Sequence, residues 1–143
     1  MVETNLDDAS PQLVGFVMER AFESGALDCY FTPVQMKKNR PGVMISILCA
    51  PPQREAMFEL LFAETPTLGV RCYEVERRAL EREFVSVETE YGRIDVKVAR
   101  MNGQVKGYMP EYEQCREAAT RANVPLRVVE AAARDAFMRF GWS

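Results

Sequence analysis

The sequence contains no histidine, and this absence limits the chemistry available to the chain. Histidine is the commonest side-chain ligand of transition metals and the usual general base near neutral pH. A metal centre built on imidazole groups is therefore excluded, and so is a catalytic site that uses histidine as its base.

Cysteine is scarce and is not arranged as a site. The four cysteines are Cys29, Cys49, Cys72 and Cys115, and no two of them form a CxxC pair. We interpret them as reduced, mostly buried small residues of a cytoplasmic protein. This interpretation excludes a disulfide framework and a metal centre built on thiolates.

Long apolar runs and an excess of basic residues are also missing. No apolar run approaches the roughly 20 residues of a membrane helix, and no signal-peptide pattern opens the chain. The net charge of −3 argues against a general nucleic-acid surface, which is usually basic. We therefore expect neither a membrane nor a nucleic acid as partner. The 143 residues suffice for one domain with its own core, and their strand-like start suggests a domain of a longer protein.

The first 80 residues predict the element order β-α-β-β-α-β. The expected strands lie at residues 2–6, on either side of a turn at residues 37–42, and from residue 70 onward; the expected helices lie at residues 11–24 and 51–65. Ser10 is the expected cap of the first helix, and Arg77 and Arg78 would lie far along the fourth strand. This order is typical of the ferredoxin-like fold, an α+β sandwich in which two helices cover one face of a four-stranded antiparallel sheet.

Residues 81–143 predict a β-hairpin and two C-terminal helices, appended to the ferredoxin-like part (residues 1–80) within a single domain, residues 1–143. Val85, Val87 and Thr89 alternate with polar residues, and the same alternation continues after a turn. Residues 102–107 are typical of either a loop or a short strand. The helices are expected from residue 110 to residue 123 and from residue 125 to residue 141.

The turn between the second and third expected strands forms a dense positive tip. Lys37, Lys38 and Arg40 are three cations within four residues, and Asn39 supplies turn chemistry. One planar guanidinium and two ammonium groups suit an anion with several oxygens, above all a polyphosphate. The alternative is an ordinary hairpin loop whose charged side chains only make the surface soluble.

The predicted topology brings charges from three loops to one end of the sheet. The first two strands of a right-handed β-α-β unit run the same way, so the loop with Asp7 and Asp8 lies at the same end as the basic turn. The loop that leads through Gly69 to Arg71 arrives there too. Carboxylates beside phosphate-binding cations are typical of metal–nucleoside triphosphate sites. Taken singly, Asp7 and Asp8 would stabilise the following helix through its dipole, and Arg71 would simply lie along the surface.

Five stretches together resemble one protein family. They are TNLDD (residues 4–8), FTPVQMKKNRPG (31–42), TPTLGVR (65–71), YGRIDVKVA (91–99) and PEYEQCREAA (110–119). The chain is similar over essentially its whole length to the C-terminal domain of the LarC family. These are the nickel-insertion proteins for the nickel-pincer nucleotide cofactor of lactate racemase.

The resemblance implies a CTP-dependent cyclometallase, which is a lyase of the nickel chelatase type. Such an enzyme inserts nickel into pyridinium-3,5-bisthiocarboxylic acid mononucleotide while CTP is hydrolysed to CMP and pyrophosphate. The resemblance also implies that this domain binds CTP with manganese or magnesium and assembles into homotrimers or hexamers. Its partner within the same protein would be the family's N-terminal part, which carries a histidine-rich segment.

The resemblance and the side-chain chemistry together assign the candidate site residues. Asp7 and Asp8 are the expected metal ligands, and with Lys37 they are the expected catalytic residues. The expected nucleotide-binding residues are Lys37, Lys38, Asn39, Arg40, Gly69 and Arg71.

A second class of function stays open at this point. Fold alone does not determine function, and ferredoxin-like modules also serve as non-catalytic ligand-sensing or oligomerisation domains. A third reading, a single-strand RNA binder of the same fold, would need aromatic residues on the central strands. Residues 2–6 and 43–49 contain none, so we discount it.

Overall fold

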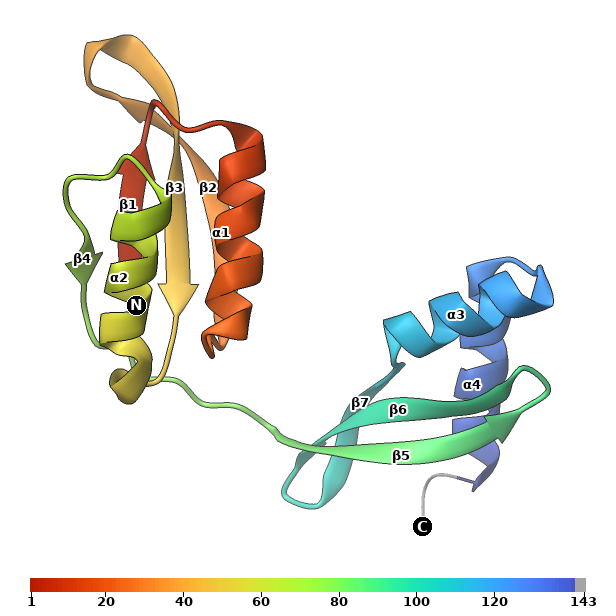
Figure 1. Ribbon diagram of the computed structural model, residues 1–143. Coiled ribbons are helices and arrows are strands. Elements are labelled where there is room, and N and C mark those ends of the chain that lie inside the picture. The colour runs from red at the N-terminus through yellow and green to blue at the C-terminus, as the bar shows by residue number, and fades with distance from the viewer. Residues whose placement is uncertain (141–143) are drawn as a thin grey trace. The chain divides into compact units, whose positions relative to one another are not determined.

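A computed structural model of the protein describes residues 1–140, which fold as two units (Figure 1). The first unit is Met1–Glu76, and the second begins at Arg77. Within residues 1–140, none of the helices combines the length and the apolar character that crossing a membrane requires.

The first unit is the ferredoxin-like sandwich that the sequence predicts. Its elements are β1 (Val2–Leu6), α1 (Pro11–Glu23), β2 (Asp28–Met36), β3 (Arg40–Leu48), α2 (Arg54–Glu64) and β4 (Arg71–Cys72). The strands form one sheet in the order β2-β3-β1-β4, in which every neighbouring pair is antiparallel. Both helices lie on the same face of this sheet (Figure 1).

Alternation along the central strands explains which face of the sheet is buried. The core of this unit includes Val2 and Leu6 of β1, Ile45 and Ile47 of β3, Val14 and Val17 of α1, and Leu61 of α2. Because successive strand residues point to opposite faces, Glu3 and Asn5 of β1 lie on the face that the helices leave uncovered. The uncovered face is therefore polar at its centre.

Local signals place the ends of α1. The Oγ of Ser10 accepts a hydrogen bond from the Leu13 N–H at 3.2 Å, and Pro11 takes the first helical position. Beyond Glu23 the chain leaves the helix through Gly25, whose φ of 91° favours glycine. The predicted cap and end of this helix are confirmed.

The fourth strand is much shorter than predicted. β4 contains only Arg71 and Cys72, which pair with Glu3 and Val2 of β1. Residues 73–80 are exposed and form no helix or strand, so Arg77 and Arg78 lie outside the sheet. Four of the five residues at 74–78 are charged, which leaves this segment no apolar face to bury.

The second unit is a three-stranded antiparallel sheet with two helices. Its elements are β5 (Glu81–Thr89), β6 (Gly92–Met101), β7 (Gln104–Pro110), α3 (Tyr112–Ala122) and α4 (Leu126–Phe140), and the strand order is β5-β6-β7. β5 and β6 are the predicted hairpin. For residues 102–107 the sequence left a loop and a short strand as alternatives. The chain turns at Asn102 and Gly103, with φ of 52° and 77°, and then enters β7, so the prediction of a strand is confirmed.

The helices of the second unit cover the apolar side of its sheet. The core includes Val87, Ile94, Val96, Val98, Cys115, Val129, Ala133 and Phe137. α3 begins at Tyr112 instead of the predicted residue 110, because Pro110 pairs with Val96 as the last residue of β7. Asn123 ends α3 with a φ of 51°, as predicted. The predicted end of the last helix at Gly141 lies outside the described residues.

The cysteines are free, but their burial differs from the prediction for one of them. Cys29 and Cys115 are buried and Cys49 is partly buried, whereas Cys72 is exposed on the short edge strand β4. Burial raises the pKa of the Cys29 thiol to about 11. This thiol therefore stays protonated near neutral pH and acts as a small apolar residue of the core.

Candidate functional site

The loop after β1 and the turn between β2 and β3 meet at one end of the first sheet. The Nη1 of Arg40 donates a hydrogen bond to the Oδ2 of Asp7 at 3.2 Å. Arg40 opens β3 and Asp7 directly follows β1, and these strands pair in the register Leu6 to Val43. The side chain of Arg40 is 57% exposed and that of Asp7 is 18% exposed, so the guanidinium stays open to a ligand while the carboxylate is largely buried.

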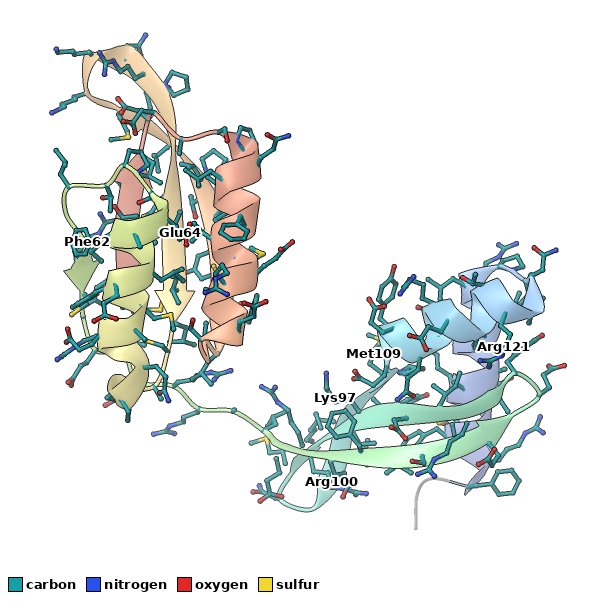
Figure 2. All side chains as sticks on the ribbon, in the orientation of Figure 1. Phe62, Glu64, Lys97, Arg100, Met109 and Arg121 are labelled. Atoms are coloured by element: carbon teal, nitrogen blue, oxygen red, sulfur yellow. The ribbon has the colours of Figure 1, made fainter. Side chains whose placement is uncertain are left out.

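The basic turn has an unusual backbone. Residues Lys37–Asn39 form a tight turn whose backbone is not that of a right-handed helix, because Lys38 has φ 59° and Asn39 has φ 57°. Asparagine adopts this left-handed region readily, whereas lysine seldom does. The amide of Gln35 supports the turn by donating to Asn39 Oδ1 at 3.0 Å. Nitrogen-tipped side chains extend from this turn away from the sheet (Figure 2), and Lys37 and Lys38 are exposed.

Gly42 lets the basic turn approach the end of β1. A Cβ at this position would lie 2.6 Å from the carbonyl oxygen of Leu6 and 2.7 Å from the Sδ of Met36. No side chain fits there without a shift of the backbone. The sequence identified Gly42 as a turn residue, and the structure assigns it a second role in bringing β3 close to Asp7.

Asp8 and the loop before β4 complete this end of the unit. Asp8 is exposed beside Asp7 and precedes the cap of α1. The hydroxyl of Thr4 donates to the carbonyl oxygen of Gly69 at 3.0 Å, and the hydroxyl of Thr67 donates to the same oxygen at 2.9 Å. These bonds hold the loop that contains Gly69 against the middle of β1.

Arg71 binds a carboxylate that the sequence reasoning missed. Its Nε donates to Glu3 Oε2 at 3.0 Å and its Nη2 donates to Asn5 Oδ1 at 3.0 Å. Ser46 and Tyr73 also donate to Glu3, each at 3.1 Å. Burial raises the pKa of the Glu3 carboxyl, but the hydrogen bonds from these three donors outweigh burial and lower it overall. Glu3 therefore stays charged inside a polar cluster on the uncovered face of the sheet.

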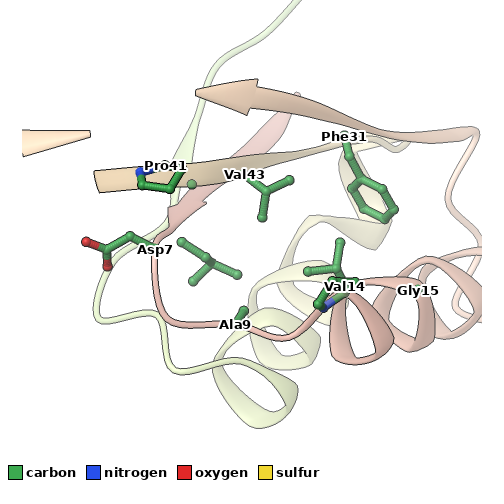
Figure 3. Close-up of a pocket in the computed structure, with 10 residues that line it drawn as sticks. Asp7, Ala9, Val14, Gly15, Phe31, Pro41 and Val43 are labelled. Carbon is green, nitrogen blue, oxygen red and sulfur yellow. The ribbon is translucent and has the colours of Figure 1, made fainter. Parts of the chain in front are cut away.

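A cavity of about 460 Å³ adjoins the Asp7–Arg40 pair (Figure 3). Its lining residues are Leu6, Asp7, Ala9, Pro11, Val14, Gly15, Phe31, Pro41, Gly42 and Val43. Most of this lining is apolar, and Asp7 is its one charged side chain. The sequence reasoning did not find the cavity, because its walls come from four separate elements.

The structure thus brings some of the expected site residues together and separates others. Asp7 contacts Arg40 of the basic turn and has Asp8 as its neighbour in sequence, whereas Gly69 and Arg71 contact β1. Among residues 1–140, no three histidine, cysteine or acidic side chains gather as a complete metal site. A divalent cation at Asp7 and Asp8 would have to take its other ligands from water or from a bound anion.

Comparison with known sequences connects this chain to one family. A family model described as "Nickel insertion protein" matches residues 1–130. The "Pyridinium-3,5-bisthiocarboxylic acid mononucleotide nickel insertion protein" of Thermotoga petrophila is 45% identical over 129 residues, which are 90% of this chain and 32% of that protein. The "Putative nickel insertion protein" of Myxococcus xanthus is 50% identical over 133 residues, 93% of this chain and 34% of that protein. The chain thus spans about a third of the length of these curated relatives.

Comparison with solved structures agrees with the sequence match. The apo form of LarC2, described as the C-terminal domain of a cyclometallase involved in the synthesis of the NPN cofactor of lactate racemase, superposes with a TM-score of 0.88 at 38% identity. The match covers 94% of this chain and 93% of that one. A protein of Methanopyrus kandleri AV19 gives a TM-score of 0.66 at 26% identity, with 94% and 84% covered. The resemblance predicted from the motifs is confirmed: the chain belongs to the nickel insertion protein family.

Proposed function

We propose that this chain is the CTP- and divalent-metal-binding domain of a nickel-inserting cyclometallase. The whole enzyme would insert nickel into pyridinium-3,5-bisthiocarboxylic acid mononucleotide, as part of nickel-pincer cofactor biosynthesis, with hydrolysis of CTP to CMP and pyrophosphate. The observation that carries the proposal is the Asp7–Arg40 pair beside two exposed lysines, within a chain of this family. Residues 1–143 would act as one functional domain.

The basic turn is proposed to hold the triphosphate. Lys37, Lys38 and Arg40 present three cations from one short turn, and their charge and donor geometry match phosphate oxygens. The guanidinium of Arg40 is already aligned by Asp7 and is more than half exposed. It can shift its hydrogen bonds from that carboxylate to a phosphate, which frees Asp7 for a second role.

Asp7 and Asp8 are the proposed ligands of a manganese or magnesium ion. Such ions are commonly held by one or two carboxylates together with phosphate oxygens, so a site with two adjacent carboxylates, and with no third ligand of this kind gathered there among residues 1–140, fits them. The bound ion would neutralise phosphate charge and act as a Lewis acid. Lys37 is the proposed catalytic cation, which would stabilise negative charge on the departing pyrophosphate.

We also propose Gly69 and Arg71 as nucleotide ligands, with weaker contributions to affinity. The carbonyl oxygen of Gly69 already accepts two hydroxyl hydrogen bonds, and Arg71 is engaged by Glu3 and Asn5. A nucleotide that reached Arg71 would have to compete with a charged, hydrogen-bonded carboxylate. We expect these two residues to contribute less to affinity than the basic turn.

The remaining parts of the activity are proposed to need more than this chain. Nickel delivery requires ligands softer than aspartate, and the chain has no histidine. We assign that step to the other part of the full-length protein. Assembly as a homotrimer or hexamer and a cytoplasmic location complete the proposal.

The test is isothermal titration calorimetry of the chain with CTP and Mn²⁺, repeated with ATP and without metal. We expect binding that requires the metal and favours CTP. A chain that binds neither nucleotide would refute CTP binding by this domain alone. The outcome would instead favour a non-catalytic sensing or oligomerisation domain. One observation favours that second function: Tyr30 and Tyr73 are 45% and 48% exposed, and Tyr73 lies at the polar cluster of the uncovered sheet face.

A further inference from the structure

The first sheet has one blocked edge and one open edge. Its outer strands are β2 and β4. β2 contains Pro33 near its middle, and a proline lacks the backbone N–H that a neighbouring strand needs, so a further strand is disfavoured beside β2. β4 contains no proline, and the sequence has none from residue 67 to residue 109. The edge at β4 is therefore the one at which this sheet can accept another strand.

The open edge continues beyond β4 along residues 73–80, which lead into β5 (Figure 1). This segment is exposed throughout and contains no turn or bend. Within residues 1–140, none of the hydrogen bonds or ion pairs involves residues 74–80. An extended chain with unpaired N–H and C=O groups is a template for pairing with another strand. The segment thus has the backbone of an edge strand without a neighbour.

Backbone hydrogen bonds determine which residues of this edge point outward. The Tyr73 N–H donates to the carbonyl oxygen of Met1 at 3.0 Å, and the amino group of Met1 donates to the carbonyl oxygen of Tyr73 at 2.8 Å. Tyr73 therefore directs its backbone groups toward β1. Successive residues of an extended chain direct these groups to opposite sides, so the even-numbered residues from Cys72 onward direct theirs outward. A regular antiparallel partner must place its own outward residues opposite them.

The charges of the segment are self-complementary in one register that meets this condition. When two copies run antiparallel with Glu76 opposite Glu76, Glu74 of each copy lies opposite Arg78 of the other, and Arg71 lies opposite Glu81. Opposite charges directly across an antiparallel pair stabilise it, and like charges destabilise it. A shift of two residues one way sets Glu74 against Glu76, and the same shift the other way loses both the Glu74–Arg78 and the Arg71–Glu81 pairs. The register centred on Glu76 is therefore the favoured one.

We propose that residues 71–81 form an antiparallel two-stranded ribbon with the same residues of a second copy of this chain, about a two-fold axis at Glu76. The inference goes beyond the proposed function, because the contact needs neither nucleotide nor metal. A two-fold contact joins copies in pairs, so it produces a dimer or connects two trimers in the proposed hexamer. A homotrimer alone has no two-fold axis and would lack this contact.

The test reverses and then exchanges the charges of one pair. Arg78→Glu places two acidic groups opposite each other, and Glu74→Arg places two basic groups opposite each other. The double variant Glu74→Arg/Arg78→Glu restores opposite charges across the ribbon. Arg127→Glu is the matched control, since it reverses an exposed arginine of α4 outside the segment. Sedimentation velocity over a range of concentrations measures assembly, and thermal unfolding checks the fold.

We expect the wild type to sediment as a dimer or a hexamer. Each single reversal should weaken the two-fold contact by about tenfold or more, giving monomers or trimers, because each pair occurs twice by symmetry and changes from attraction to repulsion. The double variant and Arg127→Glu should assemble like the wild type. Glu76→Gln removes the like charges at the axis and should strengthen the contact.

Each outcome decides the inference. Loss of pairing in both single variants with recovery in the double variant supports the ribbon and its register. A wild type that is monomeric or trimeric at every concentration overturns the inference, since neither species contains a two-fold contact. Unchanged assembly of both single variants overturns it too, because the copies would then associate through another surface. Single variants that dissociate without recovery in the double variant overturn the register and the inference with it.

Discussion

The guanidinium of Arg71 lies against the carboxylate of Glu3, with its Nε 3.0 Å from Oε2, and not against the aspartates at the end of β1. This pair belongs to the uncovered face of the first sheet, where Ser46 and Tyr73 also donate to Glu3. The charged end of the unit is therefore divided into two neighbouring clusters. One is the buried carboxylate of Glu3, whose oxygens accept hydrogen bonds from three side chains, and the other is an exposed group of cations with two aspartates.

Replacing Glu3 by glutamine should destabilise the first unit in a pH-dependent way. The hydrogen bonds from Ser46, Tyr73 and Arg71 hold the pKa of Glu3 below its ordinary value despite the opposing effect of burial. A carboxyl with a lowered folded-state pKa adds stability above its unfolded pKa and loses it as the pH falls through the folded value. We expect Glu3→Gln to cost about 1–3 kcal/mol at pH 7, and the gap to shrink below about pH 4.3. Urea unfolding of both proteins between pH 7 and pH 3 measures it, and a gap of constant size would contradict the prediction.

Arg40→Ala and Lys37→Ala should weaken CTP binding with little effect on stability. Each change removes a charge-assisted hydrogen bond to the triphosphate, which is worth about 1–3 kcal/mol, or about 5- to 150-fold in Kd. The Asp7–Arg40 pair is exposed on the arginine side, so its loss should change the free energy of unfolding by less than about 1 kcal/mol. Calorimetric titration gives the affinities. Arg82→Ala, which removes an exposed cation from β5, is the charge-matched control and should leave the Kd unchanged.

Asp8→Asn should reduce the dependence of CTP binding on the divalent metal. The substitution keeps the size of the side chain and removes the negative charge that the ion prefers. We expect the ratio of CTP affinities with and without Mn²⁺ to fall toward one. Glu19→Gln removes a comparable exposed charge from α1 and should keep the wild-type ratio. An unchanged ratio for Asp8→Asn would show that Asp8 is not a metal ligand.

Gly42→Ala should destabilise the first unit, and Gly69→Ala should not. A Cβ at Gly42 would lie 2.6 Å from the carbonyl oxygen of Leu6, so backbone must move, at a cost of about 1–3 kcal/mol. A Cβ at Gly69 meets nothing within 4 Å. Thermal unfolding compares the two variants directly. Equal melting temperatures would show that β1 and β3 can separate at this end without penalty.

The candidate site was predictable to the extent that its residues are neighbours in sequence. Lys37, Lys38 and Arg40 are adjacent in a turn, and the β-α-β rule places Asp7 at the same end, where the Asp7–Arg40 contact is found. The contact that Arg71 makes with Glu3 was not predicted in this way. Its position is set by pairing with Glu3, and a two-residue strand gives no periodic signal by which the register could be read. Along β1, Glu3 and Asn5 alternate with Val2, Thr4 and Leu6, and this alternation was the one available sign of the polar cluster.

The sequence by itself determined the order of the elements, most of their ends and the basic turn, because apolar periodicity, capping residues and turn residues act over short stretches of chain. It also contained five stretches whose resemblance to one family predicted the family correctly. The tertiary structure alone decided that β4 is short, that Glu3 binds Arg71, and that a cavity opens between α1 and the strands beside Asp7. These features depend on which residues of distant segments come into contact, and a cavity wall contributed by separate elements leaves no pattern along any one of them.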